Sequence, residues 1–307
     1  MDKLIITCAT AWDGYENVAG MHLPRTARET ADSLRQARDA GAAVAHVHEP
    51  YPKEGAPPIG TDIEAWLEVA EHIRESTDIV YEHGQGGVPY FPRRLTSGGS
   101  TVGQVQQRFD LRREKPEMIA YALNALDFVF GQRQAYSHGT REEFERDMRL
   151  CRESGVKPAM EVWHGGSFFN FQWLVDRGLL DKPYWLTCFF GGNGGMAGPA
   201  TIDELLARVK LVPPGGMWQV AIWSGIKGRA TTRDQLSIAA HAIALGGHVR
   251  VGMEDNPYYW DGIPAESNAQ IVERIAIIAR QMGREVASPN EAREMLGLST
   301  QGIKDQT

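Results

Sequence analysis

Short apolar runs alternate with longer amphipathic stretches along the whole chain. Eight of these runs have the length of a β-strand, and we predict strands at Leu4–Thr10, Ala43–Glu49, Ile79–Gly84, Met118–Asn124, Ala159–His164, Tyr184–Gly191, Trp218–Gly225 and His248–Glu254. Helical periodicity separates and follows them at roughly residues 26–40, 62–75, 102–113, 141–154, 168–178, 201–210, 232–246 and 266–282. The first helix opens with the capping box of Thr26 and Glu29 and closes at Gly41.

A strict alternation of strand and helix, repeated eight times, predicts a parallel sheet closed on itself, the (β/α)8 or TIM barrel of the α/β class. A doubly wound open sheet is the competing fold. Its first turn would carry a GxGxxG fingerprint, and residues 7–14 contain none. We therefore predict one barrel domain over residues 1–298 and a polar tail over 299–307. Residues 50–60 and 86–100 are rich in Gly, Pro and Ser and are expected to be long functional loops.

Composition and charge disfavour some classes of binding partner and cellular compartment. The 307 residues carry 39 acidic and 32 basic side chains, a formal charge of −7, which disfavours nucleic acid and anionic membrane surfaces. No apolar run approaches the ~20 residues of a membrane span, and the first residues do not resemble a signal peptide. The three scattered cysteines form no CxxC motif and fit a reducing compartment, so we expect a cytoplasmic protein.

Two histidines, His46 and His48, end the second predicted strand. Side chains at i and i+2 of a strand share a face, so both imidazoles are expected to face the barrel interior. Barrel active sites lie at the carboxyl ends of the strands, where these residues fall. Such a pair is a good half of a zinc site, and a pair of hydrogen-bonded core histidines is the alternative.

The eighth predicted strand contains Arg250 and Glu254, four positions apart and expected on one face, with Gly252 between them. The first and last strands of a closed barrel are neighbours, so Glu254 can reach His46 and His48 and complete a metal site with an open coordination position. A structural bridge between Arg250 and Glu254 is the alternative, because a buried Arg beside a carboxylate needs pairing. Asp255 and Asn256 follow and are expected to enter the barrel mouth.

Two further carboxylates lie inside predicted strands. Glu161 interrupts an otherwise apolar face of the fifth strand, where it needs a partner, a metal or a proton. It is therefore a candidate acid or base, with a pKa that burial could raise. Glu82 on the third strand invites the same argument, although its face is uncertain, and it is a candidate substrate-binding residue.

Glycine-rich loops follow the third and sixth predicted strands. Gly86 and Gly87 expose backbone amides that could hold an oxyanion, carboxylate or phosphate, and residues 191–195 form a similar loop. Plain tight turns are an equally good explanation of either loop. Trp12 and Trp163 lie where strands end and could shape a substrate pocket, as could Trp223, although aromatic residues are more often part of the core.

These motifs together resemble the beta-keto acid cleavage enzyme family. The similarity runs from the first strand through His46 and His48, is densest over residues 246–256 (Gly-Gly-His-Val-Arg-Val-Gly-Met-Glu-Asp-Asn), and continues to residues 292–298. The resemblance implies a zinc-dependent TIM barrel, agreeing with the strand count, and a homotetramer. It also implies an enzyme that condenses a β-keto acid with acetyl-CoA and releases acetoacetate and a new acyl-CoA by retro-Claisen cleavage.

By this resemblance, each candidate residue acquires a role. His46, His48 and Glu254 match the ligands of zinc or a similar divalent metal. Arg250 and Asp255 match an Arg–Asp pair in which Asp255 takes the C2 proton. Glu161 matches a further catalytic carboxylate. The phosphates of acetyl-CoA would need a local basic patch, for which the candidates are Arg93, Arg94, Lys227 and Arg229.

The chain departs from the family pattern around the substrate. The family pattern is His-x-His-x-Arg-Asp, but here Glu49-Pro50 follows His48, and Gly84-Gln85 replaces Ser-Thr. The turn after the fourth strand is replaced by residues 124–128, and Gly14 stands in place of an acidic residue that holds a substrate amine. The departures mark a divergent member.

Two explanations of these departures stay open. In the first, the substrate is a different β-keto acid, with an aromatic or quaternary ammonium tail against Trp12 and Trp163. Alternatively, the zinc site catalyses a reaction without CoA, the hydrolysis or lysis of a lactone, ester or 3-oxo acid, with Glu161 or Asp255 as base. A metal-stabilised barrel without catalysis is disfavoured, because an open coordination position has no purpose in a structural site.

Overall fold

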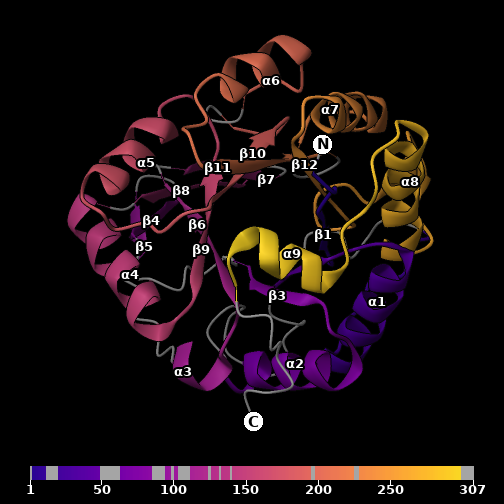
Figure 1. Ribbon diagram of the computed structural model, residues 1–307, viewed down its shortest axis with the longest axis horizontal. Helices are drawn as coiled ribbons and strands as arrows, with labels where there is room; N and C mark the ends of the chain where they lie inside the picture. Colours follow the sequence, from indigo (N-terminus) through magenta and orange to yellow (C-terminus); the bar gives the residue numbers. More distant parts are fainter. Residues whose placement is uncertain are drawn as a thin grey trace.

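Eight parallel strands close into a barrel in a computed structural model of the protein (Figure 1). The structure describes residues 2–11, 20–48, 63–84, 94–97, 100–102, 111–123, 126–130, 133–138, 140–194, 198–224 and 228–298. The barrel strands are β1 (Ile6–Ala9), β2 (Val44–Val47), β3 (Val80–His83), β6 (Met118–Ala122), β9 (Lys157–Val162), β10 (Tyr184–Phe190), β11 (Gly216–Ile222) and β12 (His248–Val251). Each of these strands overlaps one of the predicted strands, and their order along the chain is the predicted one. The predicted TIM barrel is confirmed.

Helices surround the barrel as an outer ring (Figure 1). They are α1 (Ala27–Ala40), α2 (Ile63–Ser76), α3 (Leu111–Glu114), α4 (Arg141–Ser154), α5 (Ser167–Asp176), α6 (Ile202–Val209), α7 (Thr232–Ala244) and α8 (Asn268–Gln281). The capping box predicted at Thr26 is present, with Glu29 donating its amide to the Thr26 hydroxyl. In the described part of the chain, no helix is both long and apolar enough to span a membrane.

The segment around the fourth barrel strand differs from the prediction. Val102, the expected start of a helix, instead ends β5 (Ser100–Val102), and α3 begins only at Leu111. β4 (Arg94–Ser97) lies within the predicted loop 86–100, and β7 (Leu126–Phe130) begins within the predicted turn. With β8 (Arg133–His138) these strands form an antiparallel sheet in the order β5-β4-β8-β7. The expectation of one helix after every strand left no place for this antiparallel sheet in the prediction.

Two elements after the last barrel strand were not predicted. A short hairpin joins β13 (Tyr258–Trp260) to β14 (Ile263–Pro264). Helix α9 (Pro289–Leu296) follows α8 and crosses the barrel end in Figure 1. Its ends carry local signals, a capping box of Ser288 and Glu291 and a left-handed Gly297.

The barrel interior is layered along its axis. The layer at the amino ends of the strands is apolar and packs against α9, through Ile5, Val44, Val80, Met118, Ala159, Trp185, Ala292 and Leu296. A second apolar cluster lies toward the carboxyl ends and consists of Ala122, Trp163, Phe189, Ala221 and Trp223. Buried polar and charged residues lie between these two clusters. They also line the side of the barrel that faces the aromatic rings. One end of the barrel is therefore sealed, and the chemistry-bearing side chains lie toward the other.

Candidate active site

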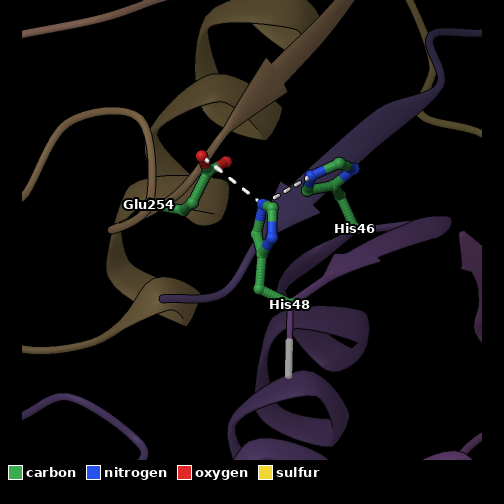
Figure 2. A group of neighbouring side chains, drawn as sticks. All are labelled: His46, His48 and Glu254. Carbon is green, nitrogen blue, oxygen red and sulfur yellow. Dashed lines mark hydrogen bonds and ion pairs between the residues drawn. The ribbon is translucent and has the colours of Figure 1, made fainter. Parts of the chain in front are cut away.

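The two histidines of the second strand lie together inside the barrel, as predicted. His46 is on β2 and is 1 % exposed, and His48 follows the end of the strand. Their Nε2 atoms are 3.1 Å apart. Both rings turn toward the same point (Figure 2).

Glu254 completes a group of three side chains that could hold a metal ion. One ligand atom from each of His46, His48 and Glu254 lies within 4.8 Å of the others. Glu254 Oε1 is 3.7 Å from His48 Nε2. The structure thus brings together the three residues that were predicted to act as ligands.

Glu254 does not lie on the strand, contrary to the prediction. β12 ends at Val251, and Gly252 has a φ of 146°. A Cβ on Gly252 would stand 2.0 Å from the carbonyl oxygen of Ala9, so only glycine fits the close approach of β12 to the end of β1. The chain then turns, and the backbone N–H of Glu254 donates to the Ala9 oxygen at 3.2 Å. The turn, rather than strand alternation, aims Glu254 at the histidines.

Asn268, at the start of α8, holds the same turn from outside the barrel. Its Oδ1 accepts from the backbone N–H of Met253 at 2.8 Å, and its Nδ2 donates to the carbonyl of Thr10 at 2.7 Å. One buried amide therefore ties the Glu254 turn to the end of β1.

The residues around the histidines fit a divalent metal. Gly84 lies against both imidazole rings. A Cβ built on it would lie 2.9 Å from His46 Nε2 and 3.0 Å from His48 Cε1. The other nitrogen of His46, Nδ1, lies 2.6 Å from Glu82 Oε1. A carboxylate on one imidazole nitrogen and a second possible ligand, His48, beside the other are typical of a zinc-binding histidine. With a carboxylate as third ligand, the donor set suits zinc or a similar ion.

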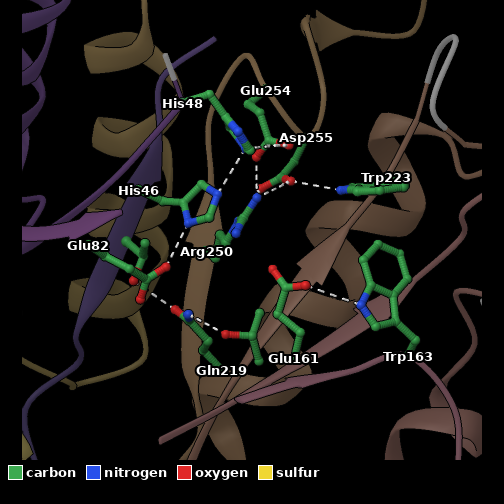
Figure 3. Close-up of polar contacts among 12 residues, drawn as sticks. His46, His48, Glu82, Glu161, Trp163, Gln219, Trp223, Arg250, Glu254 and Asp255 are labelled. Atoms are coloured by element: carbon green, nitrogen blue, oxygen red, sulfur yellow. Dashed lines mark hydrogen bonds and ion pairs between the residues drawn. The ribbon is translucent and has the colours of Figure 1, made fainter. Parts of the chain in front are cut away.

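Arg250 lies at the centre of the charged residues (Figure 3). Its Nε donates to Asp255 Oδ2 at 2.8 Å and its Nη2 donates to Asp255 Oδ1 at 3.0 Å. Nη2 also contacts Glu254 Oε2. Glu254 therefore faces Arg250 with one oxygen and the histidines with the other, so the structural bridge and the metal site are compatible. Burial disfavours the charge on Arg250, but Asp255 and Glu254 together raise its pKa above the usual value.

Two tryptophan side chains contact carboxylates of the site, those of Asp255 and Glu161. Trp223 Nε1 donates to Asp255 Oδ1 at 2.9 Å, and Trp163 Nε1 donates to Glu161 Oε2 at 3.3 Å. Trp163 also stacks on Phe189, with ring centroids 4.1 Å apart. These rings lie across Arg250 from the histidines (Figure 3), so the site has one charged wall and one aromatic wall.

Glu82 faces the barrel interior, which settles the face that its sequence left uncertain. Its side chain is 1 % exposed. Burial raises its pKa to about 8; Arg250 opposes this shift, and Glu161 and Glu254 add to it. The carboxylate contacts His46 on the side of the ring opposite His48, rather than the mouth of the barrel.

Asn256 does not join the group, although it was predicted to enter the mouth. It is fully buried, and its Oδ1 accepts from the Ser224 hydroxyl at 2.6 Å and from the Tyr258 amide at 3.0 Å. Its Nδ2 donates to Gln235 and Thr232 of α7. This network fixes the segment after Asp255 to α7.

Several predicted residues lie outside the described part of the chain, namely Trp12, Gly86, Gly87, Arg93 and Lys227. The side chain of Arg94 is also outside it. Arg229 is exposed in the loop after β11, and its backbone N–H donates to the carbonyl of Gly191 after β10 at 2.6 Å. It is thus placed at the carboxyl end of the strands.

The contacts of three residues that shape the site could not be predicted from sequence patterns. Trp223 was one of several tryptophans at strand ends, and its bond to Asp255 depends on the neighbouring strands. Asn268 lies near the start of the helix predicted at 266–282, but its contacts reach across the barrel edge to Met253 and Thr10. Gly84 precedes a glycine loop and attracts notice only once the histidines stand beside it.

Comparison with known proteins places the chain among enzymes. The model of the beta-keto acid cleavage enzyme family matches residues 3–298. A 3-keto-5-aminohexanoate cleavage enzyme of Fusobacterium nucleatum is 32% identical over 302 residues, which cover 97% of this chain and 99% of that protein. A 3-dehydrocarnitine:acetyl-CoA trimethylamine transferase of Rhizobium meliloti is 29% identical, over 97% of each chain.

A solved structure supports the fold. The complex of ObcA with oxaloacetate superposes with a TM-score of 0.66 at 15% identity, covering 92% of this chain and 68% of that one. At this identity the similarity concerns the barrel architecture alone.

Proposed function

Because this chain belongs to the beta-keto acid cleavage enzyme family, we propose that it is a zinc-dependent acyltransferase that cleaves a β-keto acid with acetyl-CoA. The products are acetoacetate and the acyl-CoA of the remaining fragment. The observation that carries the proposal is the convergence of His46, His48 and Glu254 beside the Arg250–Asp255 pair. The second substrate is supported by the similarity to the 3-dehydrocarnitine:acetyl-CoA trimethylamine transferase of Rhizobium meliloti.

His46, His48 and Glu254 would hold the metal. A bound divalent cation supplies Lewis acidity, which lowers the cost of forming an enolate from a chelated β-keto acid. Arg250, held by Asp255 and Glu254, keeps positive charge beside the substrate carboxylate and ketone. The site thereby offsets the repulsion between an anionic substrate and its own carboxylates.

Asp255 is the proposed base. It takes a proton from C2 of the β-keto acid, and the C2 carbanion attacks the thioester carbonyl of acetyl-CoA. CoA leaves as its thiolate and then adds to the original C3 ketone. The C2–C3 bond breaks, acyl-CoA forms, and the acetoacetate carbanion receives the proton at C2. Glu161, beside the aromatic wall, is the proposed second carboxylate for proton transfer.

The test is a panel of β-keto acids with apolar, aromatic and quaternary ammonium tails, incubated with zinc-loaded protein with and without acetyl-CoA. We expect acetoacetate and a new acyl-CoA to appear in equal amounts only when acetyl-CoA is present. Removal of zinc with a chelator should abolish the reaction, and its return should restore it. Turnover in the absence of CoA would replace the proposal with metal-assisted hydrolysis or lysis.

A further inference from the structure

We propose that Glu82 is a positioning residue that holds His46 in the orientation and tautomer required of a metal ligand. Glu82 was predicted to bind substrate, and its position favours a different role. The inference rests on the metal site of the proposed function. It concerns a carboxylate that would touch neither the metal nor the substrate.

The two side chains are brought together by the barrel itself. His46 and Glu82 are register partners on the parallel strands β2 and β3. Both point inward, and each is 1 % exposed. Their 2.6 Å contact between Nδ1 and Oε1 is the length of a charge-assisted hydrogen bond. The pair is thus fixed by main-chain pairing and excluded from water.

The contact determines which nitrogen of His46 is available. A neutral imidazole carries one N–H. A cation bound at Nε2 would favour the ionised form of Glu82, and the ionised carboxylate accepts from Nδ1 and leaves the lone pair on Nε2. Nε2 is the atom that lies 3.1 Å from His48 and faces the Glu254 side of the cluster. Glu82 therefore favours the tautomer in which His46 can bind a metal with its two companions.

The position of Glu82 also argues against substrate contact. The ring of His46 lies between the Glu82 carboxylate and the other two ligands (Figure 3). Within the described residues, Glu82 Oε2 has no hydrogen-bond partner, so the bond to His46 is the one that anchors the carboxylate. A molecule bound at the ligand cluster would reach Glu82 only by displacing His46.

The test compares Glu82→Ala, Glu82→Gln and Glu161→Gln by zinc affinity, measured by competition with a chelator. Loss of a carboxylate behind a metal-bound histidine costs roughly 10–100-fold in metal affinity, which we expect for Glu82→Ala. Glu82→Gln keeps an oxygen that can accept from Nδ1 and should recover part of the loss. Glu161→Gln is the matched control, because it removes one interior charge without touching His46, and its affinity should stay close to that of the wild type.

A second measurement needs no metal. In the metal-free protein at alkaline pH, where Glu82 is ionised, the Nδ1–H proton of His46 should give a downfield NMR resonance that is absent in Glu82→Ala. A third measurement uses Co²⁺ in place of zinc, and Co²⁺-loaded Glu82→Gln should show a ligand-field spectrum shifted from that of the wild type. If Glu82→Ala fails to fold, the NMR and ligand-field measurements on Glu82→Gln test the proposal instead. Wild-type zinc affinity in both Glu82 variants, or an equal loss in Glu161→Gln, would overturn the inference. If the wild-type protein shows the proton resonance but binds no zinc, the metal of the proposed function fails, and the pairing of His46 with Glu82 stands.

Discussion

Asp255 is oriented by two donors that come from different strands. Arg250 reaches it from β12 through two bonds, and Trp223 reaches it from the end of β11 through one. Both donors are buried, so no water can replace a lost bond without rearrangement. An indole N–H is uncharged and can fix the carboxylate without the strong attraction of a second cation.

Replacement of Trp223 with Phe should therefore slow the chemistry and spare the metal. A hydrogen bond to a charged group is worth about 1.5–3 kcal/mol, which corresponds to roughly 10–100-fold in rate if it orients the base. The measurement is the enzyme-catalysed exchange of C2 hydrogen of a β-keto acid with deuterated solvent, alongside zinc content. Trp218→Phe is the control, because Trp218 lies on the same strand but packs outside the barrel. Equal rates in both variants would argue against the role of Trp223.

His248 shows how burial links the fold to pH. Its Nδ1 accepts from the backbone N–H of Ile5 at 2.9 Å. Burial, with a smaller contribution from Arg284, lowers its pKa to about 3. The unfolded chain binds a proton near the ordinary pKa of 6.5 and the folded chain does not. The contribution of His248 to stability is therefore full above pH 6.5 and is lost as the pH falls from 6.5 toward 3.

Substitution of His248 with Asn should flatten this dependence. Between pH 7 and pH 5 the wild-type protein should lose about 2 kcal/mol of unfolding free energy that the variant does not lose, since each pH unit below 6.5 costs about 1.36 kcal/mol. Urea unfolding in the presence of a chelator measures the difference. His241→Asn, at an exposed site on α7, should behave as the wild type. Parallel pH curves for the wild type and His248→Asn would contradict the expectation.

At the scale of elements, the turn after β12 carries both the proposed ligand Glu254 and the proposed base Asp255. The turn exists because β12 approaches the end of β1 at Gly252 and because Asn268 of α8 holds Met253. Neither contact is local in sequence. Metal binding should consequently be sensitive to a change that leaves all three ligands in place.

Gly252→Ala is such a change. Both its positive φ and the clash with the Ala9 oxygen oppose a side chain, so we expect a loss of more than about 2 kcal/mol in unfolding free energy and a marked loss of zinc affinity. Gly246→Ala is the matched control, because Gly246 has a φ of 85° but nothing within 4 Å of the added Cβ. It should lose only about 1–2 kcal/mol and keep its zinc. Thermal unfolding and chelator competition test both.

An element can be predicted from the sequence when local patterns determine it, and cannot when contacts between distant parts of the chain do. The barrel strands were predictable because burial inside the barrel demands apolar runs, and His46 and His48 followed from strand alternation alone. The Glu254 turn was not, because β12 ends where it meets the Ala9 carbonyl. The predicted start of a helix at Val102 failed, because pairing with β4 overrides local periodicity. α9 could have been predicted from Ser288, Glu291 and Gly297, which are local signals.

At the scale of the whole molecule, the proposed function requires an acidic protein to accept anionic substrates. The chain carries a formal charge of −7, and four carboxylates surround Arg250 inside the barrel, namely Glu82, Glu161, Glu254 and Asp255. A polyanionic CoA thioester therefore needs cations outside this cluster. Arg229, exposed at the carboxyl end of the strands, is a candidate within the described chain.

Replacement of Arg229 with Ala should raise the KM for acetyl-CoA about 5-fold with little change in kcat, because a contact to a phosphate is made equally before and during the reaction. The effect should shrink as salt is added, since exposed charges are screened. Steady-state kinetics at two ionic strengths provides the measurement. Arg280→Ala is the control, because this exposed residue lies in the last turn of α8, at the opposite end of the barrel. An unchanged KM in Arg229→Ala would remove Arg229 from the CoA site.

The seal that α9 forms on the apolar end of the barrel also constrains kinetics. Because Trp185, Met118 and α9 fill the amino end of the barrel, both substrates of the proposed function should enter from the carboxyl ends of the strands. On the proposed function, the β-keto acid occupies the deeper position and acetyl-CoA lies above it. The order of binding is then imposed by the shape of the protein: the keto acid enters first, and acetoacetate leaves only after the acyl-CoA has cleared the opening.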